Sequence, residues 1–484
     1  MKIKYYGNIW VITFILCFIG NLLYGQNENN NSGIVGFWQG PHPELKHVNF
    51  IFHIYESPDR SLIGKGYWVD HGLYHAEFPI NRITFKRRDV AVKISDWGCV
   101  YKGRLARSND LIRGGFQCLN EPPDKVIIKR VKKENLYGLF PEHLNSSNDS
   151  FTYHYKKPEQ IDDDISTSSL VSSSLNPDVV SEIVRKIALG SYGRIHSFLI
   201  IKNGQLVCEE YFFGFNRDIL HPLESATKSI TSLLMGIAFE QNKNANVNDN
   251  ISQYFPEFTD SLYEENPVMV KHLLTMTSGF LFDENGMLHS PERLSFLLHS
   301  KRTASPGEKF IYSAGNTELL GGIIKKLSGK YADEFAREYL FEPLKINNFN
   351  WNTYNNNGYP LCGGALWLKP RDMAKIGLLV LNNGKWQGRQ IIPESWIEKS
   401  TIPHIKTGIG TDSYGYQWWV SDIHSHSESF KLIWANGLGS QFIFIFPELK
   451  MVIVTTGGNW VGGNDGRSWD ICNLFRDYLH LLVE

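Results

Sequence analysis

The chain has 484 residues, more than one hydrophobic core usually supports, so two domains are expected. Hydrophobic residues make up 42% and charged residues 20%, which argues against a disordered chain and against a multi-span membrane protein. The formal net charge of -1 provides no basic surface, so no nucleic-acid partner is predicted.

The first 25 residues have the pattern of a signal peptide. Lys2 and Lys4 precede an uncharged apolar run over about residues 9–23, which the small-residue sequence LLYGQ follows. This order is typical of a secretory signal, with cleavage expected near Gly25. The run is also about as long as a short membrane span, so an uncleaved anchor helix is the alternative. We therefore expect an exported protein, periplasmic or extracellular, with no stable membrane span after cleavage.

Cysteines are few in the predicted mature chain. Removal of the signal leaves Cys99, Cys118, Cys208, Cys362 and Cys472. An odd number cannot all pair. Cys99 and Cys118 flank two strand-like runs around a polar turn. The sequence is compatible with a disulfide across a hairpin and also with a pair of buried thiols. Export would permit the disulfide.

Residues 34–133 are predicted to form a small all-β accessory domain, a barrel or a sandwich. Short strand-like runs such as VNFIFHIYE, RITFKRRDVAVKIS and VIIKRV alternate with turns rich in Gly, Asn and Asp. Four aromatic residues here either fill the core or line a ligand surface, namely Trp38, Tyr67, Trp68 and Trp97. Residues 134–178 become polar, with NSSNDS and STSSLVSSS, and are predicted as a linker and lead-in segment.

Residues 179–484 are predicted to form an α+β domain, an antiparallel sheet flanked by helices. VVSEIVRKIALG has a helical pattern, and SFLIIKNGQLVCEEYF has two apolar runs around Asn203-Gly204, a strong hairpin signal. The C-terminal end mirrors this order, with a hairpin in QFIFIFPELKMVIVTTGG and a helix in SWDICNLFRDYLHLL. Strands and helices at both ends imply helices packed on one antiparallel sheet.

The stretch LESATKSITSLLMGIAFEQ, residues 223–241, contains the candidate nucleophile. Its apolar residues recur with helical period at Ile230, Leu233, Leu234, Ile237 and Ala238. Ser225 therefore lies near the start of a helix packed on a core. A serine hydroxyl needs a neighbour to take its proton, and Lys228, one turn on, can reach it. A helix N-terminus also offers a backbone N–H to a developing oxyanion.

Several further segments follow in a characteristic order. They are HLLTMTSG, PGEKFIYSAGNTELLGGIIKKLSG, GGALWLKPRDMAKIGLLVLNNGKW and ANGLGSQFIFIFP. Together with ESATKS, they resemble the serine β-lactamase and penicillin-binding-protein-like hydrolases, above all the branch of class C β-lactamases, esterases and D-alanyl-D-alanine carboxypeptidases. The resemblance covers about residues 180–480 and leaves out the predicted β domain.

The resemblance implies the chemical roles of three side chains. Ser225 would be the acylated nucleophile, and Lys228 its proton partner. Tyr312, in YSAGN, matches the tyrosine that relays protons in this family. A phenol near an ammonium has its ionised form stabilised, so the pair can share a proton.

The resemblance also implies a substrate-binding strand. An edge strand carrying a Lys/His-Thr/Ser-Gly type motif corresponds here to residues 435–437, in which Asn436 and Gly437 would contact substrate. The N–H of Leu438, opposite that of Ser225, would complete an oxyanion hole.

Two positions depart from the family pattern. Class C β-lactamases have asparagine two residues after the tyrosine, where this chain has Ala314; Asn316, two further on, is the candidate substitute for substrate binding. Asn436 is neutral where the family has residues that hold a substrate carboxylate. Both departures reduce the expected recognition of penicillins and of peptides that end in D-alanine.

The sequence thus predicts an exported serine hydrolase that cleaves a small-molecule ester, amide or D-peptide through an acyl-enzyme. A D-alanyl-D-alanine carboxypeptidase or a weak β-lactamase is the alternative within this class. An inactive cell-wall or glycan binding protein is the alternative from another class. No cofactor and no metal site are predicted, since the histidine pairs His71/His75 and His424/His426 lack further ligands. The oligomeric state is left open.

Overall fold

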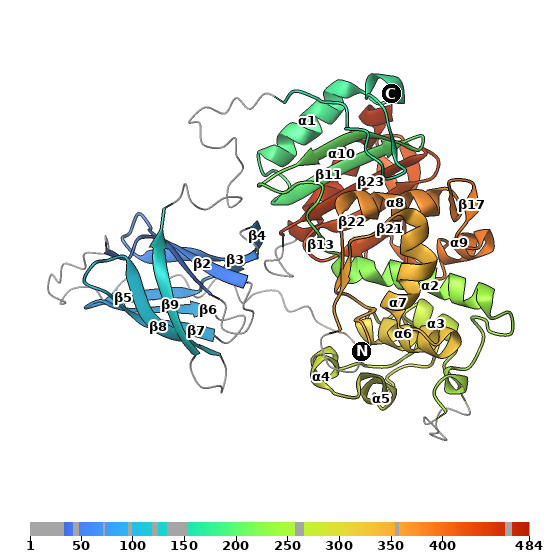
Figure 1. Cartoon of the computed structure of the whole chain (residues 1–484), viewed down its shortest axis with the longest axis horizontal. Coiled ribbons are helices and arrows are strands. Elements are labelled where there is room, and N and C mark those ends of the chain that lie inside the picture. The colour runs from blue at the N-terminus through green and yellow to red at the C-terminus, as the bar shows by residue number, and fades with distance from the viewer. Residues whose placement is uncertain are drawn as a thin grey trace, which may run out of the picture.

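The computed structural model describes residues 33–41, 48–70, 73–94, 99–118, 124–132, 153–256, 266–353, 358–459 and 467–483. It has the predicted α+β architecture, built on largely antiparallel sheets (Figure 1). The predicted signal peptide and Trp97 lie outside these residues. Within the described ranges, no helix is both long and apolar enough to cross a membrane.

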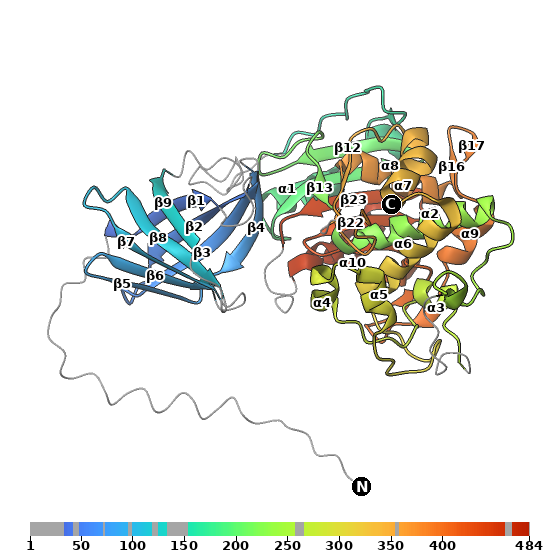
Figure 2. The ribbon, with the colours of Figure 1, turned by 60° about the horizontal axis from the view of Figure 1, so that its bottom comes forward.

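The N-terminal strands form one antiparallel sheet that curls into a nearly closed barrel (Figure 2). The sheet order is β4-β3-β2-β1-β9-β8-β7-β6-β5, so pairing of β1 with β9 joins the first and last strands. The strands are β1 (Gly36–Pro41), β2 (Val48–Glu56), β3 (Leu62–Asp70), β4 (Leu73–Pro79), β5 (Arg82–Lys86), β6 (Asp89–Ile94), β7 (Cys99–Leu105), β8 (Leu111–Cys118) and β9 (Asp124–Val131). A curled sheet of this kind leaves few unpaired edges.

Aromatic side chains fill the barrel. Trp38 and Tyr101 are fully buried in its core, whereas Tyr67 is 5% exposed and packs with Phe37 and Ile51 in a smaller apolar cluster. The Tyr101 hydroxyl donates to the carbonyls of Ile112 and Val126, and Trp38 Nε1 donates to a backbone carbonyl, so these buried polar groups are satisfied. Of the two predicted roles for Trp38 and Tyr67, the structure confirms core filling.

The cysteine at the start of β7 is oxidised. Cys99 forms a disulfide, and its register partner on β8 is Cys118. The ladder therefore puts the two predicted partners directly across from each other. Cys208, Cys362 and Cys472 are free thiols.

A second antiparallel sheet forms the centre of the C-terminal part. Its order is β10-β12-β11-β23-β22-β21-β20-β19-β18, with only β10 parallel to its neighbour. The strands are β10 (Ser166–Thr167), β11 (Ile195–Lys202), β12 (Gln205–Tyr211), β18 (Ile405–Lys406), β19 (Ser413–Tyr414), β20 (Trp419–Ser425), β21 (Glu428–Gly437), β22 (Gln441–Phe446) and β23 (Met451–Gly457). Both predicted hairpins are present, and the first turns at Asn203-Gly204, where both residues have positive φ.

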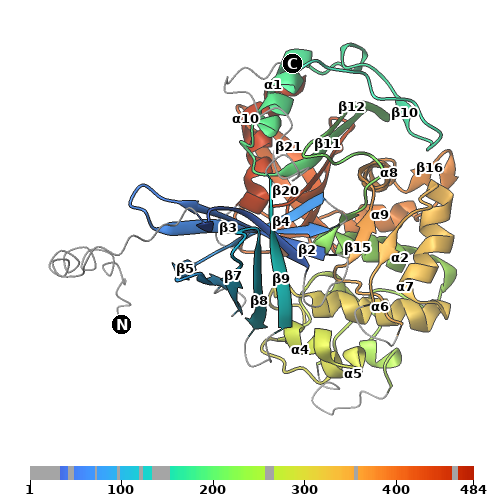
Figure 3. The same cartoon turned by 60° about the vertical axis from the view of Figure 1, so that its left-hand side comes forward.

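Helices cover both faces of this sheet. Figure 3 shows α1 and α10 on one face and α8 on the other, and separate apolar cores lie on the two faces. The helices are α1 (Pro177–Ala188), α2 (Thr227–Gln241), α3 (Val270–Leu274), α4 (Glu284–His289), α5 (Arg293–Leu298), α6 (Ala314–Ser328), α7 (Ala332–Ala336), α8 (Pro370–Leu381), α9 (Glu394–Ser400) and α10 (Asn473–Val483). Short strands β13 (His221–Pro222), β14 (Asn350–Trp351) and β15 (Leu366–Leu368) pair beside α2, and β16 (Lys385–Trp386) pairs with β17 (Arg389–Gln390).

Helix α2 is buried on every side. All of its residues from Thr227 to Ala238 are buried, whereas the sequence pattern predicted a single apolar stripe. Helices α6, α7 and α9 and strand β21 all contact α2. Its polar side chains are therefore buried too, and the hydroxyls of Ser229 and Thr231 donate to backbone carbonyls of other segments. The helix that carries the predicted lysine is thus the central scaffold of the domain.

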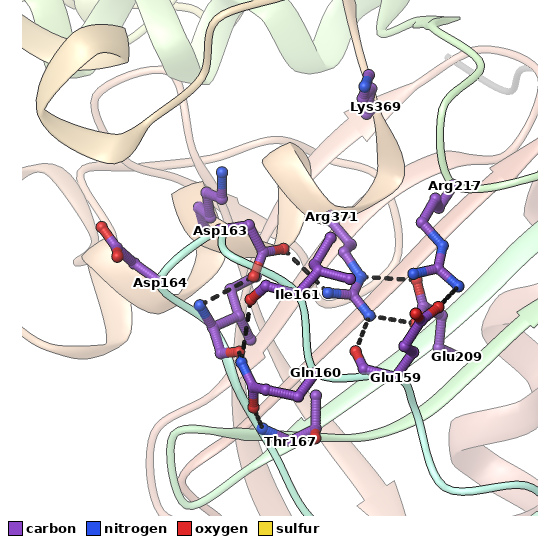
Figure 4. Close-up of polar contacts among 12 residues, drawn as sticks. Glu159, Gln160, Ile161, Asp163, Asp164, Thr167, Glu209, Arg217, Lys369 and Arg371 are labelled. Carbon is purple, nitrogen blue, oxygen red and sulfur yellow. Dashed lines mark hydrogen bonds and ion pairs between the residues drawn. The ribbon is translucent and has the colours of Figure 1, made fainter.

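A buried charge network ties the lead-in segment to the sheet (Figure 4). Arg371 of α8 is 4% exposed. Its Nε and Nη2 donate to the two carboxylate oxygens of Glu209 on β12, at 2.7 and 2.5 Å, and its Nη1 donates to Asp163 at 3.0 Å. Burial alone lowers the pKa of Arg371, but these carboxylates outweigh burial, and the net pKa is raised above its ordinary value. The network therefore fastens the predicted lead-in segment to β12 and α8 at once.

Removing this arginine is expected to destabilise the C-terminal part by about 3–5 kcal/mol, because Arg371→Met leaves the buried Glu209 carboxylate without its cation. Urea unfolding of the full chain measures the change. Arg217→Met is the matched control: it removes a more exposed ion pair with Glu159, of 2.7 Å, and should cost about 1 kcal/mol or less. Equal losses in the two variants would contradict this role for Arg371.

Candidate active site

Ser225 lies in a tight turn between a short strand and the central helix. The turn is the 3₁₀ helix η5 (Glu224–Ala226), which follows β13 and leads directly into α2. Glu224 has a φ of 48°, a left-handed conformation that costs a non-glycine residue roughly 1–2 kcal/mol. The N–H of Leu223 donates to the Leu366 carbonyl at 2.7 Å and holds the turn from outside. Strain of this kind is common where a backbone must present a functional side chain.

Lys228 lies beneath Ser225. It is 2% exposed, and its Nζ donates to Ser225 Oγ at 2.8 Å and to the Gly363 carbonyl at 2.6 Å. The hydrogen bond expected from the three-residue spacing is therefore present. Because the amine has two fixed acceptors, its position relative to the serine oxygen is well defined.

A buried carboxylate supports the second of these acceptors. Glu318 of α6 is 3% exposed and accepts from the Gly363 N–H at 2.8 Å. Arg293 Nη1 lies 3.4 Å from the same carboxylate. Burial raises the pKa of Glu318, although Arg293 and two backbone N–H groups favour its ionised form. Glu318 thus fixes the Gly363 peptide, whose carbonyl in turn orients Lys228.

Tyr312 lies beside this pair. The Lys228 ammonium is 5.0 Å from the centroid of the Tyr312 ring, and the side chain is 38% exposed. Trp419 and Tyr414 hold the ring, with centroids at 5.6 and 6.1 Å. Its hydroxyl has no hydrogen-bond partner among the described residues. This hydroxyl therefore makes no hydrogen bond to Ser225 Oγ, although both side chains face the same cavity.

Strand β21 ends at the serine turn. The resemblance implied an edge strand, but β21 is an interior strand that pairs with both β20 and β22. Pairing with β20 begins at Trp419 opposite Trp434, so residues 435–437 extend beyond it and, among the described strands, pair with β22 alone. A Cβ added to Gly437 would lie 2.1 Å from the Leu223 carbonyl oxygen. Glycine is therefore required for this close approach of the strand to the turn.

This approach brings two backbone donors to the same region. The N–H groups of Ser225 and Leu438 donate no hydrogen bond to other described residues. Unpaired backbone donors are uncommon in folded proteins except where water or a ligand takes their hydrogen bonds. The pair can therefore hold an oxyanion.

A cavity of about 530 Å³ opens above the serine. Its lining residues are Ser225, Tyr312, Ile409, Asp412, Trp419, Trp434, Asn436, Leu438 and Trp469. Aromatic and aliphatic side chains dominate this lining, as in many small-molecule sites. Six of the predicted site residues therefore meet in one cavity or directly beside it, namely Ser225, Lys228, Tyr312, Asn436, Gly437 and Leu438.

Asn316 is the predicted site residue that lies elsewhere. It is 1% exposed and does not line the cavity. Its Oδ1 accepts from the Ser278 hydroxyl at 2.6 Å, and its Nδ2 lies 3.4 Å from Met276 Sδ. The first turn of α6 points this side chain into the protein, where it joins the helix to the preceding loop.

The comparisons with known proteins agree with this geometry. The family model described as Beta-lactamase matches residues 196–461, more than half of the chain. The chain belongs to the beta-lactamase family. The match leaves out the N-terminal barrel.

Three relatives show how far the likeness extends within the beta-lactamase family. The 6-aminohexanoate-dimer hydrolase of Paenarthrobacter ureafaciens is 22% identical over 287 residues, 53% of this chain and 71% of the relative. Protein flp of Staphylococcus aureus strain N315 is 28% identical over 195 residues, 35% of this chain but only 38% of flp. A solved Bacillus anthracis protein, provisionally named a 6-aminohexanoate-dimer hydrolase, is 26% identical with a TM-score of 0.52, covering 61% and 82% of the two chains.

Sequence reasoning missed several residues that surround the core of this site. Glu318 and Gly363 carry no motif of their own, although both lie in segments that match the family. Asp412 lies in a glycine-rich loop, TGIGTDSYG, with no periodic pattern. Trp419 is adjacent to Trp418 in sequence, yet Trp418 is fully buried in the core while Trp419 lines the cavity.

Proposed function

We propose that this chain is a serine hydrolase that cleaves an ester or amide through a covalent acyl-enzyme on Ser225. The observation that carries the proposal is the 2.8 Å hydrogen bond between Lys228 Nζ and Ser225 Oγ at the base of a cavity that Tyr312 also lines. A nucleophile within hydrogen-bond reach of a proton acceptor, itself oriented by a third group, is the arrangement that nucleophilic catalysis requires. Here the Gly363 carbonyl is that third group.

The proposed reaction has two steps. Ser225 Oγ attacks the acyl carbonyl while its proton passes to the Lys228–Tyr312 pair, and the carbonyl oxygen takes the negative charge. The N–H groups of Ser225 and Leu438 stabilise this oxyanion, a contribution worth about 3–4 kcal/mol per donor in other hydrolases. The same pair returns the proton to the leaving alcohol or amine, and water then releases the acid and restores the serine.

The cavity favours neutral, apolar acyl substrates. The described lining contains no lysine or arginine to hold a substrate carboxylate, so penicillins and D-alanyl peptides are less well supported as substrates. The names of two relatives point to hydrolysis of a small linear amide, which the same chemistry would allow. Because of the apolar run near the N-terminus, we also propose that the protein is exported.

Covalent labelling tests the proposal. The purified chain would be incubated with an alkyl fluorophosphonate, and with panels of p-nitrophenyl esters, anilides, D-alanyl peptides and penicillins. We expect a single adduct on the peptide that contains Ser225 and turnover of short esters. An unlabelled protein that hydrolyses none of the panel would contradict the proposal and favour a binding role instead.

A further inference from the structure

The lining of the cavity beside Ser225 contains a half-buried acid, Asp412, that the proposed reaction does not use. Asp412 immediately precedes β19, in which Ser413 pairs with Val420 of β20, so Asp412 lies opposite Ser421. The Ser421 hydroxyl donates to Asp412 Oδ1 at 2.6 Å, and the same hydroxyl accepts from Trp434 Nε1 at 3.0 Å. This chain of hydrogen bonds fixes the carboxylate at the cavity wall.

The second oxygen of this carboxylate, Oδ2, can still accept a hydrogen bond. No hydrogen bond to Asp412 Oδ2 and no ion pair to Asp412 is formed among the described residues. Lys406, the cation that acts on it electrostatically, is exposed, whereas Lys228 acts on Glu224 and Glu318. Partial burial disfavours the ionised form of a carboxylate that has no cation beside it, and burial accordingly raises the pKa of Asp412. A cation in the cavity would favour the ionised form again. The arrangement is therefore one that a cationic ligand would complete.

Aromatic rings flank the same region. The Trp419 ring centroid lies 5.6 Å from that of Tyr312 and 5.7 Å from that of Trp434, and all three side chains line the cavity with Asp412. The faces of such rings attract ammonium groups, most strongly where water is excluded. Rings beside a carboxylate thus favour an ammonium group and disfavour an anion.

We propose that the substrate carries a protonated amine, which binds between Asp412 and the rings of Trp419 and Trp434 while its acyl carbonyl lies at Ser225. This inference rests on the proposed function and specifies the substrate class. It requires a flexible or linear substrate, since one end must reach the serine and the other the carboxylate.

Matched ester pairs test the inference. For an amine on the acyl side, p-nitrophenyl 6-aminohexanoate is compared with p-nitrophenyl heptanoate; for an amine on the alcohol side, 6-aminohexyl acetate is compared with heptyl acetate. In each pair a methyl group replaces the ammonium at nearly constant shape. We expect kcat/KM to favour the amine in at least one pair by roughly 10- to 100-fold, as for hydrogen bonds to charged groups. Asp412→Asn should remove most of that ratio.

The control is Asp422→Asn, which removes an exposed carboxylate from the neighbouring position on β20 and should leave the ratio unchanged. Active-site titration with a fluorophosphonate corrects each rate for folded enzyme. Equal rates within both pairs, or an amine preference that survives in Asp412→Asn, would overturn the inference. If Ser225→Ala still hydrolysed the neutral esters, the proposed function itself would fail instead.

Discussion

Replacing Ser225 by alanine is expected to lower kcat/KM for a short neutral ester by roughly 10⁴- to 10⁶-fold, as for other serine nucleophiles. In the proposed reaction, the substitution removes the atom that forms the acyl-enzyme, and the Lys228 amine then has no hydroxyl to deprotonate. The residual rate would come from the oxyanion donors and from substrate binding alone. Stopped-flow measurement of p-nitrophenol release should show an initial burst in the wild type and none in the variant.

The control for this variant is Ser181→Ala. Ser181 lies on α1, and its hydroxyl donates to the Pro177 carbonyl at 2.7 Å on an exposed surface. The control should keep the burst, the turnover and the fluorophosphonate adduct. A Ser225→Ala protein that still becomes acylated would place the nucleophile elsewhere.

The second large effect is expected for Lys228→Met, which should reduce kcat by roughly 10²- to 10⁴-fold, the usual range for loss of a positioned proton acceptor. Methionine approximates the length and the packing of lysine but cannot accept or donate the proton of Ser225. The variant should also lose the fixed contact to the Gly363 carbonyl. Steady-state kinetics on the same ester, at several pH values, measures the change in kcat.

A second buried lysine serves as the control. Lys375 on α8 is 1% exposed and donates to Asp372 at 2.9 Å, so Lys375→Met also removes a buried, paired ammonium. It should lower the midpoint of urea unfolding while the folded fraction keeps its kcat. If the two variants lost activity in parallel, Lys228 would be a structural residue rather than a chemical one.

Short-range patterns in the sequence predicted most of the fold. The Asn203-Gly204 turn, the closing hairpin and the spacing of Ser225 and Lys228 depend on residues a few positions apart, and each is present. The many short strand-like runs in residues 34–133 predicted the all-β N-terminal domain. The contacts of the lead-in segment could not be predicted from its polar composition, because Asp163 and its neighbours are held by Arg371, which is far away in the sequence.

The site depends on how segments far apart in the sequence are aligned, which limited what could be predicted about it. The cavity role of Asp412 depends on how β19, β20 and β21 align, so that Ser421 and Trp434 meet its carboxylate. Likewise, Glu318 supports Lys228 only because Gly363 is folded back across α2. Asn316 does not line the cavity, because the packing of neighbouring segments sets the direction in which the first turn of α6 points its side chains. No local pattern contains this information.

The tryptophans that line the cavity also allow ligand binding to be followed by fluorescence. Three of the 13 tryptophans, Trp419, Trp434 and Trp469, border the space that a ligand would fill. A ligand that displaces water from these indoles would change their fluorescence emission, so the ligand would not need a chromogenic leaving group. Even a protein that has lost its nucleophile would thus report which molecules enter the pocket and how tightly they are held.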